Sequence, residues 1–252
     1  MPGFRAPLRR LRESGILIHI MTTLREKLAA NLAAVHARIQ TACERSRRSP
    51  REITLVAVTK TVSSEVAAEL VAHGVRDLGE NRPQELWRKA AILPRDVRWH
   101  LIGHLQRNKI ERTVPLVHRI HAVDSVRLLE ALDGAAADHP IHAMLEFNCS
   151  GEASKQGFSE SNLREVVDAM SHLRHLRVVG LMTMAAFEED PQRCRPTFAK
   201  LRHIRDDLRA ALGDRHPLAE LSMGMSNDFE VAIEEGSTAI RLGTVLFEGT
   251  QP

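Results

Sequence analysis

Short apolar runs recur along the chain from residue 53 onward, and the stretches between them place apolar residues three and four positions apart. The runs predict buried strands, and the spacing between them predicts amphipathic helices. This alternation is typical of repeated βα units and a parallel sheet. We predict eight strands, at residues 53–60, 76–80, 98–103, 119–123, 141–148, 176–184, 220–223 and 239–247. The pattern favours an α/β fold, a single closed (β/α)8 TIM-type barrel, with an open doubly wound sheet as the alternative.

One further helix is expected before the first strand. Residues 23–26, Thr-Leu-Arg-Glu, have the form of a capping box, and apolar residues follow at helical spacing up to Cys43. We therefore place the barrel domain at residues 22–252. Residues 1–21 are expected to be an extension that is disordered or not native. They are basic with a single acid, which suits either a targeting peptide or a start codon placed too early, because Met21 opens the helix.

Composition narrows the functional classes. The chain is 43% hydrophobic and 27% charged, with no apolar run near the roughly 20 residues that a membrane helix needs. Its 35 basic and 32 acidic residues are interspersed, so a nucleic-acid interface is not indicated. The three cysteines lack metal-ligand spacing, and most of the 13 histidines are expected at the surface. We expect a cytoplasmic protein without metal or membrane contact, and a monomer, because no second domain follows to cap the barrel.

Lys60 is the first candidate for chemistry, because it closes an apolar run at the carboxyl end of a predicted strand. That end of a parallel sheet is where α/β folds place their functional groups. A lysine beside an apolar wall and nearby cations loses its proton more readily and attacks aldehydes to form a Schiff base. The alternative is a solvated lysine at a strand end.

Other polar residues are predicted at the same rim of the barrel. Taken singly, each is more often a structural polar group than a catalyst, and their shared position is what favours a site. They are Glu80, Asn81, Trp99, His100, His104, Glu146 and Asn148.

The last two predicted strands have the composition of a phosphate site. In TIM-type barrels glycines there let backbone N–H groups approach phosphate, and hydroxyl groups add donors. Residues 221–226 and 241–244 supply both, although two ordinary glycine turns would look the same. Arg241 is predicted to be buried, and a buried guanidinium needs a partner, which Glu146 could supply structurally. A Schiff-base lysine, a phosphate cradle and an inward arginine together fit pyridoxal 5′-phosphate.

Several motifs along residues 24–249 resemble one known family. The chain is similar to the YggS/PROSC family of pyridoxal phosphate homeostasis proteins. The motifs that carry the resemblance are Ala-Val-Thr-Lys at 57–60, Gly-Glu-Asn at 79–81, Trp-His-Leu-Ile-Gly-His-Leu-Gln-Arg-Asn-Lys at 99–109, Ser-Lys-Gln-Gly-Phe at 154–158, Gly-Leu-Met-Thr-Met at 180–184, Leu-Ser-Met-Gly-Met-Ser-Asn-Asp at 221–228 and Ile-Arg-Leu-Gly-Thr at 240–244.

The resemblance implies a barrel similar to the N-terminal domain of alanine racemase, and it implies roles for individual residues. Lys60 would hold the cofactor as an internal aldimine, with Asn81 close to the aldimine side of the ring. Arg241 would face the pyridine nitrogen. The phosphate would be held by Ser222 and Ser226 and by backbone groups of Met225, Gly243 and Thr244.

The resemblance also implies a protein that holds, buffers or delivers pyridoxal phosphate to apo-enzymes without catalysis of its own. The chain has no tyrosine to act as the second base of a racemase, and this absence agrees with a non-catalytic role. The alternative is a pyridoxal-phosphate-dependent amino-acid racemase or lyase that uses His104 or Cys149. A third hypothesis is an aldolase that forms a Schiff base directly with a sugar phosphate.

Overall fold

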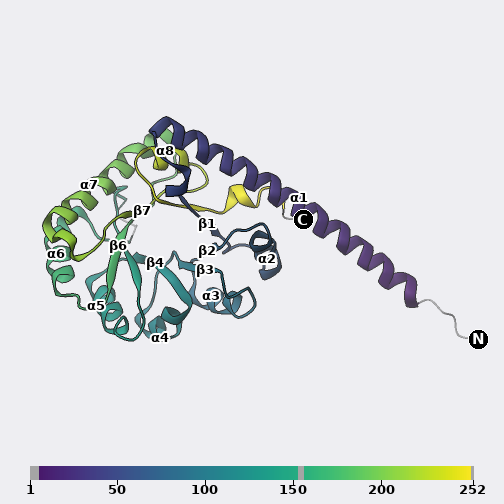
Figure 1. Ribbon diagram of the computed structural model, residues 1–252, viewed down its shortest axis with the longest axis horizontal. Helices are drawn as coiled ribbons and strands as arrows, with labels where there is room; N and C mark the ends of the chain where they lie inside the picture. Colours follow the sequence, from purple (N-terminus) through teal and green to yellow (C-terminus); the bar gives the residue numbers. More distant parts are fainter. Residues whose placement is uncertain (1–5, 153–155, 251–252) are drawn as a thin grey trace, which may run out of the picture.

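The structure, a computed structural model, describes residues 6–152 and 156–250, with side chains from residue 23 onward. Eight parallel strands in this part of the chain close into a barrel in which sequence neighbours pair and β8 returns to β1 (Figure 1). The predicted barrel is confirmed, and the open sheet is excluded. The strands are β1 (Thr54–Val58), β2 (Asp77–Glu80), β3 (Arg98–Leu101), β4 (Val117–Val123), β5 (His142–Glu146), β6 (Arg177–Met182), β7 (Glu220–Ser222) and β8 (Ala239–Leu242).

Helices connect the strands and surround the barrel (Figure 1). Adjacent residues of a strand point to opposite faces, so each strand presents one face to the helices and one to the barrel interior. Leu145 and Leu181 belong to the main core, whereas Met144 and Met182 belong to a separate small cluster. The helices are α1 (Ala6–Ser46), α2 (Ser64–Ala72), α3 (Pro83–Ala90), α4 (Ile110–Thr113), α5 (Val126–Ala135), α6 (Leu163–His172), α7 (Arg195–Leu212) and α8 (Phe229–Glu234).

Helix α1 differs from the expectation at its start. It runs without interruption from Ala6, so the capping box expected at residues 23–26 does not begin a helix. Its second half packs beside α8, where Arg38 and Arg45 form ion pairs with Glu230 and Glu234, and its first half projects beyond the barrel (Figure 1). Residues 1–5 lie outside the described residues, and the domain boundary at residue 21 stays a prediction.

Six of the eight strands are shorter than predicted at their carboxyl ends, whereas β2 and β4 end at the predicted residue. The run at 239–247 forms a strand only to Leu242 and then a 3₁₀ turn, Thr244–Leu246, while the run at 53–60 ends as a strand at Val58. In the last of these runs the apolar pattern continues because Leu246 and Phe247 are buried outside the sheet, in and next to a 3₁₀ turn that contacts α1. The residues left over form the loops of the barrel mouth, where the candidate site lies.

None of the helices in the described part of the chain has the length and hydrophobicity of a membrane-spanning segment.

Candidate functional site

Lys60 and Asn81 lie side by side at the mouth of the barrel. β1 pairs with β2 at Val58 and Gly79, and the next hydrogen bond runs from the Thr59 N–H to the Gly79 carbonyl. This register, carried two residues further, sets Lys60 beside Asn81. Both side chains are exposed, and Lys60 forms no ion pair with any residue of the described chain. The two residues are therefore neighbours at the ends of adjacent strands, and their roles toward a cofactor stay predictions.

The backbone of Asn81 is held in place by a close approach from β3. A Cβ atom added to Gly103 would lie 2.3 Å from the Asn81 carbonyl oxygen, so only glycine fits there. The glycine of the motif at 99–109 therefore acts by bringing the end of β3 against the end of β2. This contact fixes the place of Asn81 at the rim.

A hydroxyl and two backbone amides converge at the end of β8. The Oγ of Ser226 accepts hydrogen bonds from the N–H groups of Gly243 and Val245, at 3.3 and 3.4 Å. Both are longer than the usual distance near 2.9 Å, so these donors are only weakly satisfied. Gly243 lies next to β1, where an added Cβ would be 3.4 Å from the Val58 carbonyl oxygen, so this group of donors borders the strand that carries Lys60.

The loop that carries Ser226 begins with a turn that requires glycine. Gly224 has φ +96°, and an added Cβ would lie 2.6 Å from the Cβ of Ala232. The next residue, Met225, donates its backbone N–H to the Oδ1 of Asp228 at 2.6 Å. The Met225 amide is thus already engaged within the loop, in contrast to the weakly bonded amides of Gly243 and Val245.

Arg241 is buried, and neutral groups accept its hydrogen bonds. Its Nη1 donates to the carbonyl and the Oγ of Ser222, at 2.8 and 2.6 Å, and its Nη2 donates to the Thr183 carbonyl at 2.9 Å. The structural ion pair considered for Glu146 is absent among the described residues, so that interpretation was wrong. Burial lowers the pKa of Arg241 to about 10, while Asp228 and Glu146 counteract the shift. The guanidinium therefore keeps its charge near pH 7.

Ser222 occupies a different environment from Ser226. Its side chain is fully buried, and its Oγ lies 2.8 Å from the Nδ1 of His121 as well as 2.6 Å from Arg241. His121 in turn contacts His100, whose Nε2 lies 2.9 Å from Asp77. The expectation of mostly surface histidines is wrong for His121, and His100, which was expected at the rim, is also fully buried. Sequence reasoning missed His121, which lies between the apolar residues Ile120 and Ala122 on β4.

The two residues considered as a second catalytic group differ in chemistry. The Nδ1 of His104 lies 2.9 Å from the Oδ2 of Asp124, and its side chain is 49% exposed, so it is a histidine oriented by a carboxylate at the mouth. Cys149 is buried, and burial raises the pKa of its thiol to about 11. It therefore stays protonated and is a poor acid or base near neutral pH.

Three other rim candidates, Glu80, Glu146 and Asn148, are buried or are bonded to other residues of the protein. Glu80 is fully buried and pairs with Lys89 at 2.6 Å. Glu146 is also buried, and burial together with Asp124 raises the pKa of its carboxyl group. The amide of Asn148 donates to the Glu152 carbonyl at 2.8 Å. The motif at 154–158 lies partly outside the described residues.

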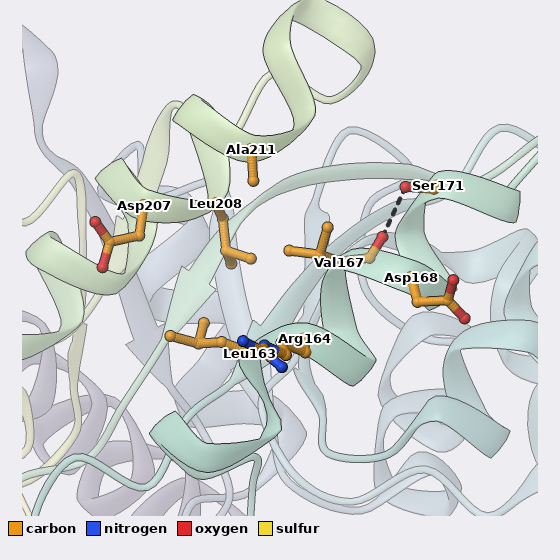
Figure 2. A pocket seen from close by; sticks show the side chains of 8 residues that line it. All are labelled: Leu163, Arg164, Val167, Asp168, Ser171, Asp207, Leu208 and Ala211. Atoms are coloured by element: carbon orange, nitrogen blue, oxygen red, sulfur yellow. Dashed lines mark hydrogen bonds between the residues drawn. The ribbon is translucent and has the colours of Figure 1, made fainter.

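The described surface also has a groove of about 450 Å³ on the outside of the barrel. Figure 2 shows it between α6 and α7, lined by Leu163, Val167 and Leu208, with Asp207 and Asp168 on opposite sides. Its lining comes from helices alone and includes none of the predicted site residues. The groove is therefore separate from the mouth.

Comparison with known proteins decides the family. Residues 30–251 match the family described as "Alanine racemase, N-terminal domain". The chain is 41% identical over 219 residues to the pyridoxal phosphate homeostasis protein of Aquifex aeolicus, covering 86% of this chain and 95% of that one. It is 36% identical over 231 residues to the human protein of the same name, covering 86% and 84%. The chain belongs to the pyridoxal phosphate homeostasis protein family.

Solved structures agree with this assignment. PipY of Synechococcus elongatus, solved with pyridoxal phosphate bound, is 34% identical and superposes with a TM-score of 0.75, covering 87% of this chain and 99% of PipY. Alanine racemase of Corynebacterium glutamicum is 18% identical, with a TM-score of 0.69 over 88% of this chain and 60% of the racemase. That second likeness concerns the fold alone, and it confirms the expected resemblance to the racemase barrel.

Proposed function

We propose that this chain binds pyridoxal 5′-phosphate at the barrel mouth and holds or delivers it without catalysing a reaction of its own. The observation that carries the proposal is the convergence of an exposed Lys60, a buried cationic Arg241 and the weakly bonded amides around Ser226 at one rim. When bound, the cofactor supplies an aldehyde that a lysine amine captures as a Schiff base with loss of one water. Membership of a family whose relatives carry the homeostasis name supports the same role.

The contacts of the site fit this ligand group by group. The amides of Gly243 and Val245 and the Oγ of Ser226 form a cradle of donors suited to phosphate. Gly243 and Thr244 contribute through the backbone, and Met225 belongs to the same loop. Ser222 has no surface to offer a ligand, so we assign it to Arg241 instead of the phosphate. Asn81, beside Lys60, would lie on the side of the aldehyde.

Arg241 also favours a carrier over an enzyme. A guanidinium that keeps its proton cannot protonate the pyridine nitrogen, so the ring withdraws electrons less strongly than one paired with an acid. Racemases of the related barrel type need a second base opposite the lysine, and this sequence has no tyrosine for that role. Weak activation of the ring suits storage and transfer of the cofactor.

The proposal extends to the setting in which the protein acts. We place it in the cytoplasm as a monomer that meets apo-enzymes briefly and passes the cofactor to them. Sedimentation of the pure protein should give a single species near the mass of one chain. Transfer should appear as recovery of activity by a pyridoxal-phosphate-dependent apo-enzyme mixed with the loaded protein. A dimer, or recovery no faster than release into buffer, would contradict this part.

The decisive experiment is an absorbance spectrum of the protein with pyridoxal phosphate, followed by borohydride reduction and peptide mapping. A visible band and a reduced adduct on Lys60 are expected. Lys60→Ala should lose the adduct but retain weaker binding, because the phosphate donors remain. An adduct on another lysine, or equal affinity in the variant and the parent, would contradict the assignment.

The second candidate function is a racemase or lyase, which the pairing of His104 with Asp124 at the mouth favours. An imidazole oriented by a carboxylate is a suitable acid or base. Exchange of the α-deuterium of amino acids in the presence of the cofactor distinguishes the two functions. Exchange that disappears in both Lys60→Ala and His104→Gln would replace the carrier with the enzyme, and no exchange with any amino acid would exclude it.

A further inference from the structure

A row of hydrogen-bonded side chains crosses the interior of the barrel. It consists of Arg241, Ser222, His121, His100 and Asp77, here called the polar column, and consecutive members lie 2.6, 2.8, 2.8 and 2.9 Å apart. Each member is at most 8% exposed. The bond between His121 on β4 and Ser222 on β7 joins strands that are not neighbours, so it must cross the interior.

Burial and neighbouring charges set the protonation states of Asp77, His100 and His121, the members of the column farthest from Arg241. Burial raises the pKa of Asp77, but hydrogen bonds from Arg98 and His100 outweigh this effect and hold the pKa well below its usual value. Asp77 is therefore a carboxylate, which only accepts hydrogen bonds. Burial lowers the pKa of His100 more than Asp77 raises it, and burial lowers that of His121 further. Both rings are neutral at pH 7 and carry one N–H each.

These constraints leave a single arrangement of protons. His100 must donate from Nε2 to Asp77, so its Nδ1 accepts from the Nε2 of His121. The Nδ1 of His121 then accepts the hydroxyl proton of Ser222. That leaves the Oγ of Ser222 to accept from Arg241, which only donates. Every hydrogen bond in the column thus points from the mouth toward Asp77.

One consequence concerns Arg241. The hydroxyl group of Ser222 cannot rotate without breaking its bond to His121, so its lone pair stays directed at the guanidinium. Two carbonyl groups, those of Ser222 and Thr183, complete the set of acceptors. No acidic side chain of the described residues hydrogen-bonds to Arg241. The guanidinium is therefore held in one place while its charge remains available to a ligand at the mouth.

We propose that Ser222, His121, His100 and Asp77 are positioning residues that orient Arg241 toward the pyridine side of the bound cofactor and so set the electronic environment of the ring. This inference rests on the proposed function, because it needs a ring at the mouth. The column itself is present in the protein alone and does not depend on the cofactor.

The proton arrangement is tested in the protein without cofactor by NMR of the histidine ring nitrogens. His100 and His121 should both be neutral at pH 7 and carry their proton on Nε2. A proton on Nδ1 of either ring would break the sequence of donors and overturn the column. This measurement remains informative even if the protein binds no pyridoxal phosphate.

The effect on the ring is tested with Ser222→Ala and His121→Phe. Each should shift the visible band of the complex with pyridoxal phosphate and raise its Kd about three- to tenfold, because Arg241 loses a fixed acceptor. His121→Asn offers an amide oxygen near the position of Nδ1 and should restore much of the parent spectrum. Persistence of the parent band in Ser222→Ala would overturn the proposal.

Matched controls separate positioning from general destabilisation. Ser237 is a fully buried serine bonded to the Met223 carbonyl at 2.7 Å, and His216 is a buried histidine 3.0 Å from the Met170 carbonyl. Ser237→Ala and His216→Phe should lower stability but leave the band and the Kd unchanged. Equal shifts in these controls would overturn the positioning role. A parent protein with no band and no adduct would refute the proposed function and the role toward the ring, whereas the NMR result would still stand.

Discussion

The polar groups at the barrel mouth are exposed or weakly hydrogen-bonded, whereas those buried beneath it form short hydrogen bonds. At the mouth, Lys60 and Asn81 are exposed, and the hydrogen bonds to Ser226 measure 3.3 and 3.4 Å. Beneath it, the polar column and the Lys89–Glu80 pair are buried, and their bonds measure 2.6 to 2.9 Å. Weakly bonded groups are free to take up a ligand, whereas saturated groups fix the framework. The distinction separates residues that bind from residues that position.

The two lysines near the ends of β1 and β2 show this contrast directly. Lys89 is 1% exposed and donates at 2.6 Å both to Glu80 and to the Thr59 carbonyl, which precedes Lys60. Lys60 has no such partner in the described chain. A buried pair of this kind stabilises little compared with apolar residues, but it is costly to break, because one charge is left without a partner. Lys89 thus anchors the strand end that presents Lys60.

The largest expected effect comes from Lys89→Met. It leaves Glu80 buried and unpaired, and it should lower the free energy of unfolding by about 3 to 5 kcal/mol in urea titrations. Lys60→Met, the matched change at the mouth, should alter stability by less than about 0.5 kcal/mol. Equal losses in the two variants would remove the contrast between the lysines. The double variant Glu80→Leu with Lys89→Met should recover most of the loss, since no charge stays buried.

A smaller effect is expected from pH, and the buried histidines of the polar column contribute to it together with half-buried ones such as His118. Burial lowers the pKa of His100 and of His121, whereas the unfolded chain has ordinary histidines near 6.5. The unfolded state therefore binds more protons below pH 6.5, and stability falls as the pH decreases. The groups that face these rings are Asp77, Arg98, His118, Arg119, Ser222 and Arg241.

Urea titrations at pH 7.5 and 5.5 measure this dependence. His121, whose pKa lies well below its ordinary value, should contribute about 1 kcal/mol to the loss, and His100 should contribute in the same direction. His121→Phe should show a shallower dependence than the parent, because one group that titrates only on unfolding has been removed. His203→Phe, at an exposed histidine, should keep the parent slope. A slope unchanged in His121→Phe would mean that His121 is not held neutral.

The sequence predicted the barrel and the mouth because both depend on local patterns. Apolar runs at regular intervals specify the strands, and Lys60, Asn81 and Arg241 come at their carboxyl ends, where pairing registers bring them to one rim. The carboxyl ends of most strands were predicted too long, since the apolar pattern does not distinguish a residue in the sheet from one packed against a helix.

The column could not be predicted in the same way, because its partners are far apart in the sequence. His121 and Ser222 are 101 positions apart and meet across the barrel. A polar residue that alternates with apolar ones on a strand reads locally as solvent-facing. In a closed barrel the same alternation places it in the interior, so His121 was mistaken for a surface residue. Only the closed topology reveals which face each residue takes.

A modest effect on binding is expected at the mouth from Ser226→Ala. The variant removes a hydroxyl donor from the cradle but leaves the amides of Gly243 and Val245 in place. The Kd for pyridoxal phosphate should correspond to a loss of about 0.5 to 1.5 kcal/mol, with little change in stability. Fluorescence titration checks the affinity, and urea unfolding checks the stability. An unaltered Kd would remove Ser226 from the phosphate cradle.

The smallest effect is expected from Thr244→Ala, which asks whether the cradle is built from backbone or from side chains. Thr244 is exposed and begins the 3₁₀ turn after β8, whose amides lie against Ser226. If the turn binds phosphate through N–H groups, removal of the Thr244 hydroxyl should change the Kd by less than about 0.5 kcal/mol. A loss as large as that of Ser226→Ala would show that the mouth recognises phosphate through side chains. The backbone at the end of β8 would then be a scaffold, as the column is for Arg241.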